Sequence, residues 1–146
     1  YKTGRYAEAL RELRTVRRLN GSSEHLAIMA DCERGLGRPE RAIALAASEE
    51  AASLEPGAAI ELAIVVSGAR LDLGEAEAAH AVLSESAITK LGGATGIVAV
   101  RVAQARAAAL EALGRSEEAV ESLAGFSVAE LAEAGGESAD GDVEGG

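Results

Sequence analysis

The residues of this chain best suited to chemistry are two histidines, His25 and His80, and one cysteine, Cys32. A zinc site needs several Cys, His or carboxylate ligands at fixed spacing, and neither histidine has such neighbours. Cys32 cannot form a disulfide within the chain, and on a predicted helix it is expected to be a small buried side chain. These residues therefore predict no metal and no cofactor.

Neither phosphate binding nor acid–base catalysis is indicated elsewhere. The pair Gly92-Gly93 lacks the Lys and the Ser or Thr that a phosphate-binding loop needs. The paired carboxylates Glu49-Glu50 and Glu117-Glu118 fall at predicted helix starts, where they favour the helix dipole. The sequence predicts no catalytic residues and a protein that is not an enzyme.

Charge is distributed unevenly along the chain. Residues 1–41 carry nine Lys or Arg against six Asp or Glu, whereas residues 42–146 carry five against eighteen, so +3 and −13 give the net −10. An acidic surface repels a phosphate backbone, so nucleic acid is not an expected partner. The exception is a basic cluster on the first predicted helix, formed by Arg11, Arg14, Arg17 and Arg18. We interpret this cluster as a solvated helix face, with docking of an acidic partner as the alternative.

An internal repeat defines the elements that position these residues. A glycine followed five residues later by an alanine occurs in the segments GRYAEAL, GRPERAI, GEAEAAH and GRSEEAV. The glycines at 4, 37, 74 and 114 stand 33, 37 and 40 residues apart, a period typical of helical repeat arrays. Each glycine is expected to end one helix in the left-handed conformation, with polar residues opening the next. The expected helices cover residues 6–19, 23–36, 39–47, 56–73, 75–83, 96–113 and 116–124.

Small residues are expected where the two helices of a pair cross, because larger side chains would hold the axes apart. Those on the second helices are Ala9, Ala42, Ala79 and Ala119. Those on the first helices are Ala30, Ser67 and Ala107. The sequence therefore predicts close contact within each pair.

The opening stretch YKTGRYAEALRELRTVRRLN resembles the second half of a tetratricopeptide repeat (TPR), with glycine, tyrosine, glutamate, alanine and leucine in family order. The resemblance covers residues 1–126. It implies an all-α, helical-repeat solenoid of antiparallel helix pairs, with about three complete pairs and an unpaired first helix. The segment Leu54-Glu55-Pro56 is similar to the family's closing Leu-Asp-Pro but comes late, which predicts an extra turn near Ser48. Residues 127–146 are expected to form a short helix and an acidic, glycine-rich disordered tail.

Ligands of this family usually bind in a concave groove lined by the first helix of each pair. The resemblance therefore implies a non-catalytic protein–protein interaction scaffold that binds a peptide or a partner domain. The expected groove residues are Asp31, Arg34, Ile64, Leu71, Arg101 and Gln104. Arg34 and Arg101 are the expected charge anchors. Family members that clamp a terminal carboxylate use lysine and asparagine where this chain has Ala27, Asp31, Ile64 and Gly68, so that activity is not implied.

Two further functions stay open. The chain can be a regulatory or sensor domain of a larger protein such as a transcription regulator, which an upstream DNA-binding helix-turn-helix would indicate. It can also self-assemble, because the first helix has lost its pair. In that case Leu10, Leu13 and Val16 are expected to form a homodimer contact.

The remaining composition concerns location and origin. No apolar run approaches the roughly 20 residues that span a bilayer, so no membrane association is expected. A start at Tyr1 inside a repeat is typical of a fragment. Two lysines against twelve arginines, with abundant alanine and glycine, indicate a GC-rich bacterial genome, and the single cysteine favours the cytoplasm.

Overall fold

A computed structural model describes residues 2–21 and 23–135, and this part of the chain is helical throughout with no strand. The predicted all-α class is confirmed. The helices are α1 (Lys2–Asn20), α2 (Leu26–Gly35), α3 (Pro39–Ala46), α4 (Glu49–Ala52), α5 (Pro56–Asp72), α6 (Ala76–Val82), α7 (Glu85–Lys90), α8 (Gly96–Ala112) and α9 (Ser116–Leu123). A further helix lies at 128–135. The tail residues 136–146 lie outside the described residues.

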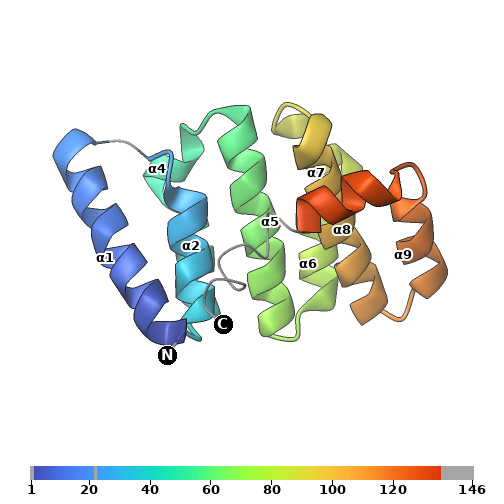
Figure 1. Ribbon diagram of the computed structural model, residues 1–146, viewed down its shortest axis with the longest axis horizontal. Coiled ribbons are helices and arrows are strands. Elements are labelled where there is room, and N and C mark those ends of the chain that lie inside the picture. The colour runs from blue at the N-terminus through green and yellow to red at the C-terminus, as the bar shows by residue number, and fades with distance from the viewer. Residues whose placement is uncertain (1, 22, 136–146) are drawn as a thin grey trace.

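The helices stand in a row that runs from α1 at one end to α9 at the other (Figure 1). Helix α2 packs against α3, α5 against α6, and α8 against α9. The longer helices α2, α5 and α8 also contact one another in that order, and α1 packs against α2. Each two-helix unit therefore contacts the next one through both of its helices, because α3 also packs against α5 and α6 against α8.

Three of the four repeat glycines end a helix as predicted. Gly37, Gly74 and Gly114 have φ angles of 77°, 76° and 77°, in the left-handed region that glycine adopts without a steric penalty. The residue after each glycine donates its amide to a carbonyl near the end of the preceding helix, as in Arg115 N to Leu110 O at 2.9 Å. This is the Schellman arrangement, and it ends α2, α5 and α8 in the same way.

The corner predicted at Gly4 is wrong, because Gly4 lies inside α1. Helix α1 runs from Lys2 through Gly4 to Asn20, so Gly4 is an interior helix position. We therefore expect opposite effects at the two kinds of glycine. Gly114→Ala should lower the free energy of unfolding by about 1–2 kcal/mol, the cost of a left-handed alanine. Gly4→Ala should raise it by about 0.5–1 kcal/mol, because an added Cβ meets nothing within 4 Å and alanine favours helix.

Urea unfolding of the two variants beside the original chain measures both effects. Equal losses in the two variants would mean that Gly4 also holds a conformation that only glycine can adopt.

Small residues do meet at the helix crossings. Ala30 and Ala42 are fully buried and belong to one core cluster. The Ser67 hydroxyl donates a 2.9 Å hydrogen bond to the carbonyl of Ala79, which joins α5 to α6 directly. A larger residue at any of these positions would overfill the contact, at a typical cost of about 1–3 kcal/mol.

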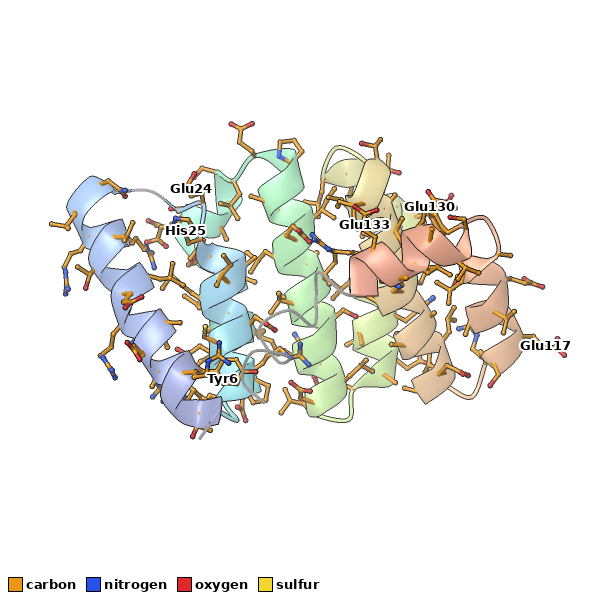
Figure 2. All side chains as sticks on the ribbon, in the orientation of Figure 1. Tyr6, Glu24, His25, Glu117, Glu130 and Glu133 are labelled. Atoms are coloured by element: carbon orange, nitrogen blue, oxygen red, sulfur yellow. The ribbon has the colours of Figure 1, made fainter. Side chains whose placement is uncertain are left out.

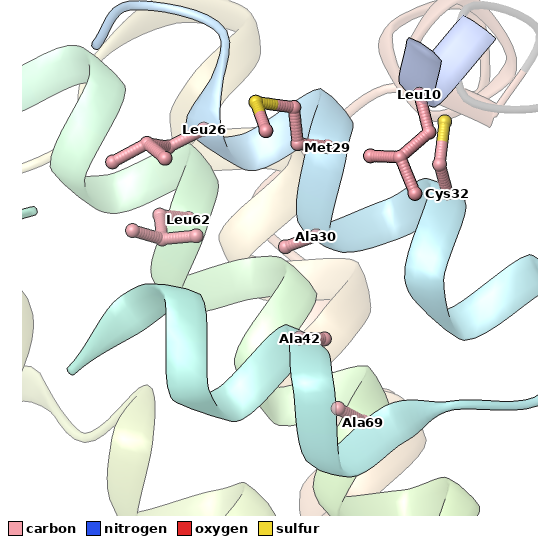
Figure 3. Packing of buried hydrophobic residues seen from close by; sticks show 8 residues of the cluster. All are labelled: Leu10, Leu26, Met29, Ala30, Cys32, Ala42, Leu62 and Ala69. Atoms are coloured by element: carbon pink, nitrogen blue, oxygen red, sulfur yellow. The ribbon is translucent and has the colours of Figure 1, made fainter. Parts of the chain in front are cut away.

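The first core cluster covers the face of α1 that was expected to be open. Leu10 is 2% exposed and lies beside Cys32 of α2 (Figure 3). Leu13 packs against the same cluster, whereas Val16 is 37% exposed. Of the three residues expected to form a homodimer contact, Leu10 and Leu13 therefore pack against this cluster within the chain.

Two short helices fill the segments between the units. The extra turn predicted near Ser48 is α4. The segment at 84–95, which none of the expected helices covers, contains α7, and the hydroxyl of its N-cap residue Ser84 accepts a hydrogen bond from the amide of Ala87 at 3.2 Å. Ile88 of α7 is buried in a second core cluster with Leu83. Within the described part of the chain, no helix combines the length and apolar content needed to cross a bilayer.

Candidate functional site

The candidate site is a groove of about 1280 Å³ formed chiefly by α2, α5 and α8. Tyr6 of α1 and the first residues of α3 complete its wall. Of the predicted groove residues, Asp31, Arg34, Ile64 and Arg101 line it. Leu71 and Gln104 do not. Figure 2 shows Glu24 and Tyr6 near opposite ends of α2, so the groove follows the length of that helix.

Arg34 joins α2 to α5 along the groove. Its Nε and Nη2 atoms donate to the two carboxylate oxygens of Asp72, at 2.7 and 3.1 Å, and its Nη1 atom donates to Asp31 at 3.3 Å. The hydrogen bond to Asp72 is the main cause that raises the pKa of Arg34 above its ordinary value. A two-pronged contact of this kind fixes orientation as well as distance.

Gly68 makes room for this ion pair. A Cβ atom at Gly68 would lie 2.5 Å from Arg34 Nη1, closer than any stable contact. The Arg34 guanidinium therefore crosses the surface of α5 at Gly68, where no side chain is in its way. Gly68, read in the sequence only as a groove position, sets the path of Arg34 to Asp72.

Arg101 plays the equivalent part between the next two helices. Its Nη1 atom donates to Glu61, which ties α8 to α5. Both arginines expected to anchor a ligand thus already bind carboxylates of the same chain. An anionic ligand would have to compete with these internal partners.

Apolar side chains make up much of the remaining wall. Ile28 is 53% exposed and Leu73 is also exposed, and both line the groove. Ile64, Val65 and Val98 contribute partly buried surface beside them. The site can therefore bury apolar groups of a ligand next to charged ones.

The helix at 128–135 crosses α8 (Figure 1). Gln104 of α8 donates to the carbonyl of Leu131 at 3.1 Å, and Ala134 is fully buried. This contact explains why Gln104 does not line the groove. The helix begins with a reciprocal cap, in which Ser127 N donates to Glu130 Oε1 and Glu130 N donates to Ser127 Oγ. The spacing of Ser127 and Glu130 is a capping box that the sequence analysis missed.

A buried carboxylate joins α2 to its neighbours. The Glu33 side chain is 3% exposed and accepts from Arg14 at 3.2 Å and Arg38 at 2.7 Å. It links α2 to α1 and to the corner before α3. No motif in the sequence marks Glu33, because its partners stand 19 and 5 residues away.

The basic cluster of α1 is partly used inside the chain. Arg14 binds Glu33, and Arg17 binds Glu50 at 2.9 Å. Arg11 and Arg18 are exposed. The interpretation of the cluster as one solvated face is therefore corrected for Arg14 and Arg17, which form ion pairs within the chain.

The residues considered first for chemistry lie apart from one another. Cys32 is buried, and burial raises the pKa of its thiol, which disfavours the reactive thiolate. His25 Nε2 lies 3.4 Å from Glu24, and His80 belongs to α6. Among residues 2–21 and 23–135, no three His, Cys, Asp or Glu side chains are grouped so that they could hold a metal ion. Comparisons of the chain with models of protein families, with curated proteins and with solved structures gave no match.

Proposed function

We propose that this protein is a non-catalytic interaction module, a TPR-like solenoid that binds a peptide or a segment of a partner protein in the groove of α2, α5 and α8. The observation that carries the proposal is the groove itself. Its volume of about 1280 Å³ exceeds the roughly 300–1,000 Å³ typical of small-molecule sites. Its exposed apolar side chains can bury apolar groups of a peptide, and its charged side chains can pair with charges of the peptide.

The solenoid part of the proposal is supported by what the units share. Each has a glycine corner with the same φ angle, small buried residues at the crossing and a first helix in contact with the next first helix. Units of this kind bury their apolar faces by stacking, and the stack presents an extended surface.

Ion pairs between the first helices also favour binding. Arg34 with Asp72 and Glu61 with Arg101 join the three helices that form the groove. A wall held in place before binding loses little conformational entropy when a ligand arrives. The groove is therefore suited to bind without rearrangement of its backbone.

Filling the groove should weaken binding. Gly57 of α5 lines the groove, its φ angle is not in the left-handed region, and an added Cβ would meet nothing within 4 Å. Gly57→Trp therefore places an indole in the groove without disturbing the fold. Gly125→Trp is the matched control, because Gly125 is equally open and is not part of the groove.

The measurement uses peptides selected by the original chain from a displayed random library. The peptides, about 12 residues each, would span about 40 Å when extended. We expect them to bind the original chain and Gly125→Trp equally and to bind Gly57→Trp at least about tenfold more weakly, a loss of about 1.4 kcal/mol. Equal binding to all three proteins, or a selection that yields no peptide, would contradict the proposal.

A further inference from the structure

We propose that the groove selects a cationic segment of a partner protein, in which Lys or Arg residues alternate with apolar ones. This inference rests on the proposed docking function and adds the chemical class of the ligand. Three observations support it: the charges that line the groove, the internal partners of the two groove arginines, and the apolar surface that adjoins the groove carboxylates.

Carboxylates outnumber basic groups in the groove. Among the described residues that line it, the acidic ones are Glu24, Asp31, Glu40, Glu61 and Asp72. The basic ones are Arg34 and Arg101, so five negative and two positive charges leave a net charge of −3. A concave surface with one sign of charge concentrates ligands of the opposite sign.

The two positive charges are also the least accessible to a ligand. Arg34 is held by Asp72 and Asp31, and Arg101 is held by Glu61. The Arg101 side chain is 16% exposed, so an anion would have to displace an existing, partly buried partner. Glu24 and Glu40 are exposed at the groove wall, and Glu24 Oε1 lies 3.4 Å from His25 Nε2. The field that an approaching ligand meets is therefore negative.

Apolar surface adjoins these carboxylates. Ile28 of α2 is half exposed and lies four residues after Glu24, which is in the turn before α2, and Pro39 precedes Glu40 at the start of α3. A ligand with apolar side chains next to its cationic ones would bury the former while pairing the latter. Charge complementarity of this type governs partner choice and association rate more than total affinity.

Other occupants have the wrong sign. The chain's own C-terminal residues include Glu137, Asp140, Asp142 and Glu144 and carry no Lys or Arg. Nucleic acid is likewise anionic. Both would be repelled by the groove carboxylates, which leaves a cationic protein segment as the fitting partner.

A charge series of peptides tests the inference. Peptides of one length, about 12 residues, alternate Leu with Lys, with Gln or with Glu, and their binding to the full chain is followed by fluorescence anisotropy. We expect the Lys peptide to bind at least about tenfold more tightly than the Gln peptide, and the Glu peptide not to bind. The affinity of the Lys peptide should fall about fivefold or more when the salt concentration is raised to about 0.3 M, where the Debye length is about 6 Å.

Variants with neutralised carboxylates separate the effect of the groove charges on binding from the effect of the overall net charge of −10. Glu24→Gln/Glu40→Gln removes two groove carboxylates and should weaken the Lys peptide about fivefold or more. Glu117→Gln/Glu121→Gln removes two charges from α9, outside the groove, and should leave its affinity within about twofold. The pairs are matched, because Glu40 and Glu117 both lie in the first turn of an eight-residue helix.

Each outcome decides one question. Equal affinity of the Lys and Gln peptides, lost in Gly57→Trp, would overturn the charge selection and leave groove docking intact. Equal weakening by both pairs of neutralised variants would overturn it as well, because overall charge would then explain the attraction. Preference for the Glu peptide, or no binding of the Lys peptide, also overturns it. The peptides selected by the original chain, tested for binding to Gly57→Trp, then decide independently whether the groove binds another class of peptide.

Discussion

Replacing both partners of Glu33 with methionine, as Arg14→Met/Arg38→Met, is expected to lower the free energy of unfolding by about 3 kcal/mol. The Glu33 carboxylate is 3% exposed, and those two guanidiniums are the partners it has in the described structure. Without them a buried negative charge remains unpaired. The value is at the lower end of about 3–5 kcal/mol for broken buried pairs, because both guanidinium ends reach solvent.

The same site should recover when the charge itself is removed. Adding Glu33→Met to the double variant replaces the whole ion cluster with apolar side chains, a change that is often neutral or stabilising. We expect most of the lost stability to return. Urea unfolding of the double and triple variants measures this, with Arg115→Met as the control whose partner, Glu118, is exposed. A triple variant no more stable than the double variant would show that lost packing, and not an unpaired carboxylate, caused the effect.

Leu83→Ala should have an effect of similar size, a loss of about 2–5 kcal/mol, by opening a cavity in the second core cluster. Leu83 is 0% exposed and packs with Ile60 of α5 and Val102 of α8. Its carbonyl accepts two hydrogen bonds from Arg106, at 2.9 and 2.6 Å, and these stay in the variant. The substitution therefore removes side-chain packing while the backbone remains anchored.

Leu19→Ala is the control of the same chemistry. Leu19 is 83% exposed at the end of α1, so its truncation should change stability by about 0.5 kcal/mol or less. Thermal or urea unfolding of both variants gives the comparison. A loss below about 1 kcal/mol for Leu83→Ala would mean that the helices around the cavity collapse into it, and that the contacts between α5 and α8 are not fixed.

Local rules predicted much of the fold. Glycine corners and small crossing residues act over a few residues, so Gly37, Gly74 and Gly114 could be placed from spacing alone. The same rule failed at Gly4, because spacing alone does not distinguish a glycine inside a helix from one that ends it. The cover of Leu10 was missed for a related reason: it depends on the way α1 docks on α2, which periodicity does not specify.

The groove was predicted in part. The expected lining residues came from the family resemblance, whereas the pairing of its arginines depends on the register between helices that lie one repeat apart. Arg34 and Asp72 are separated by 38 residues, and Glu61 and Arg101 by 40. Both separations are close to the repeat period, so opposite charges one period apart were a readable signal for contacts between first helices. The contact that covers Gln104 could not be predicted from the sequence. It is a hydrogen bond to Leu131, and it depends on where the helix at 128–135 packs.

The most direct test of groove docking is a titration of the isotopically labelled chain with the Lys peptide, followed through the amide resonances. We predict that the largest shift changes fall on residues of the groove wall, such as Ala27, Asp31 and Ile64, and that they vanish in Gly57→Trp. Shift changes centred instead on Arg11 and Arg18 of α1, or on α9, with the groove unchanged, would contradict the account.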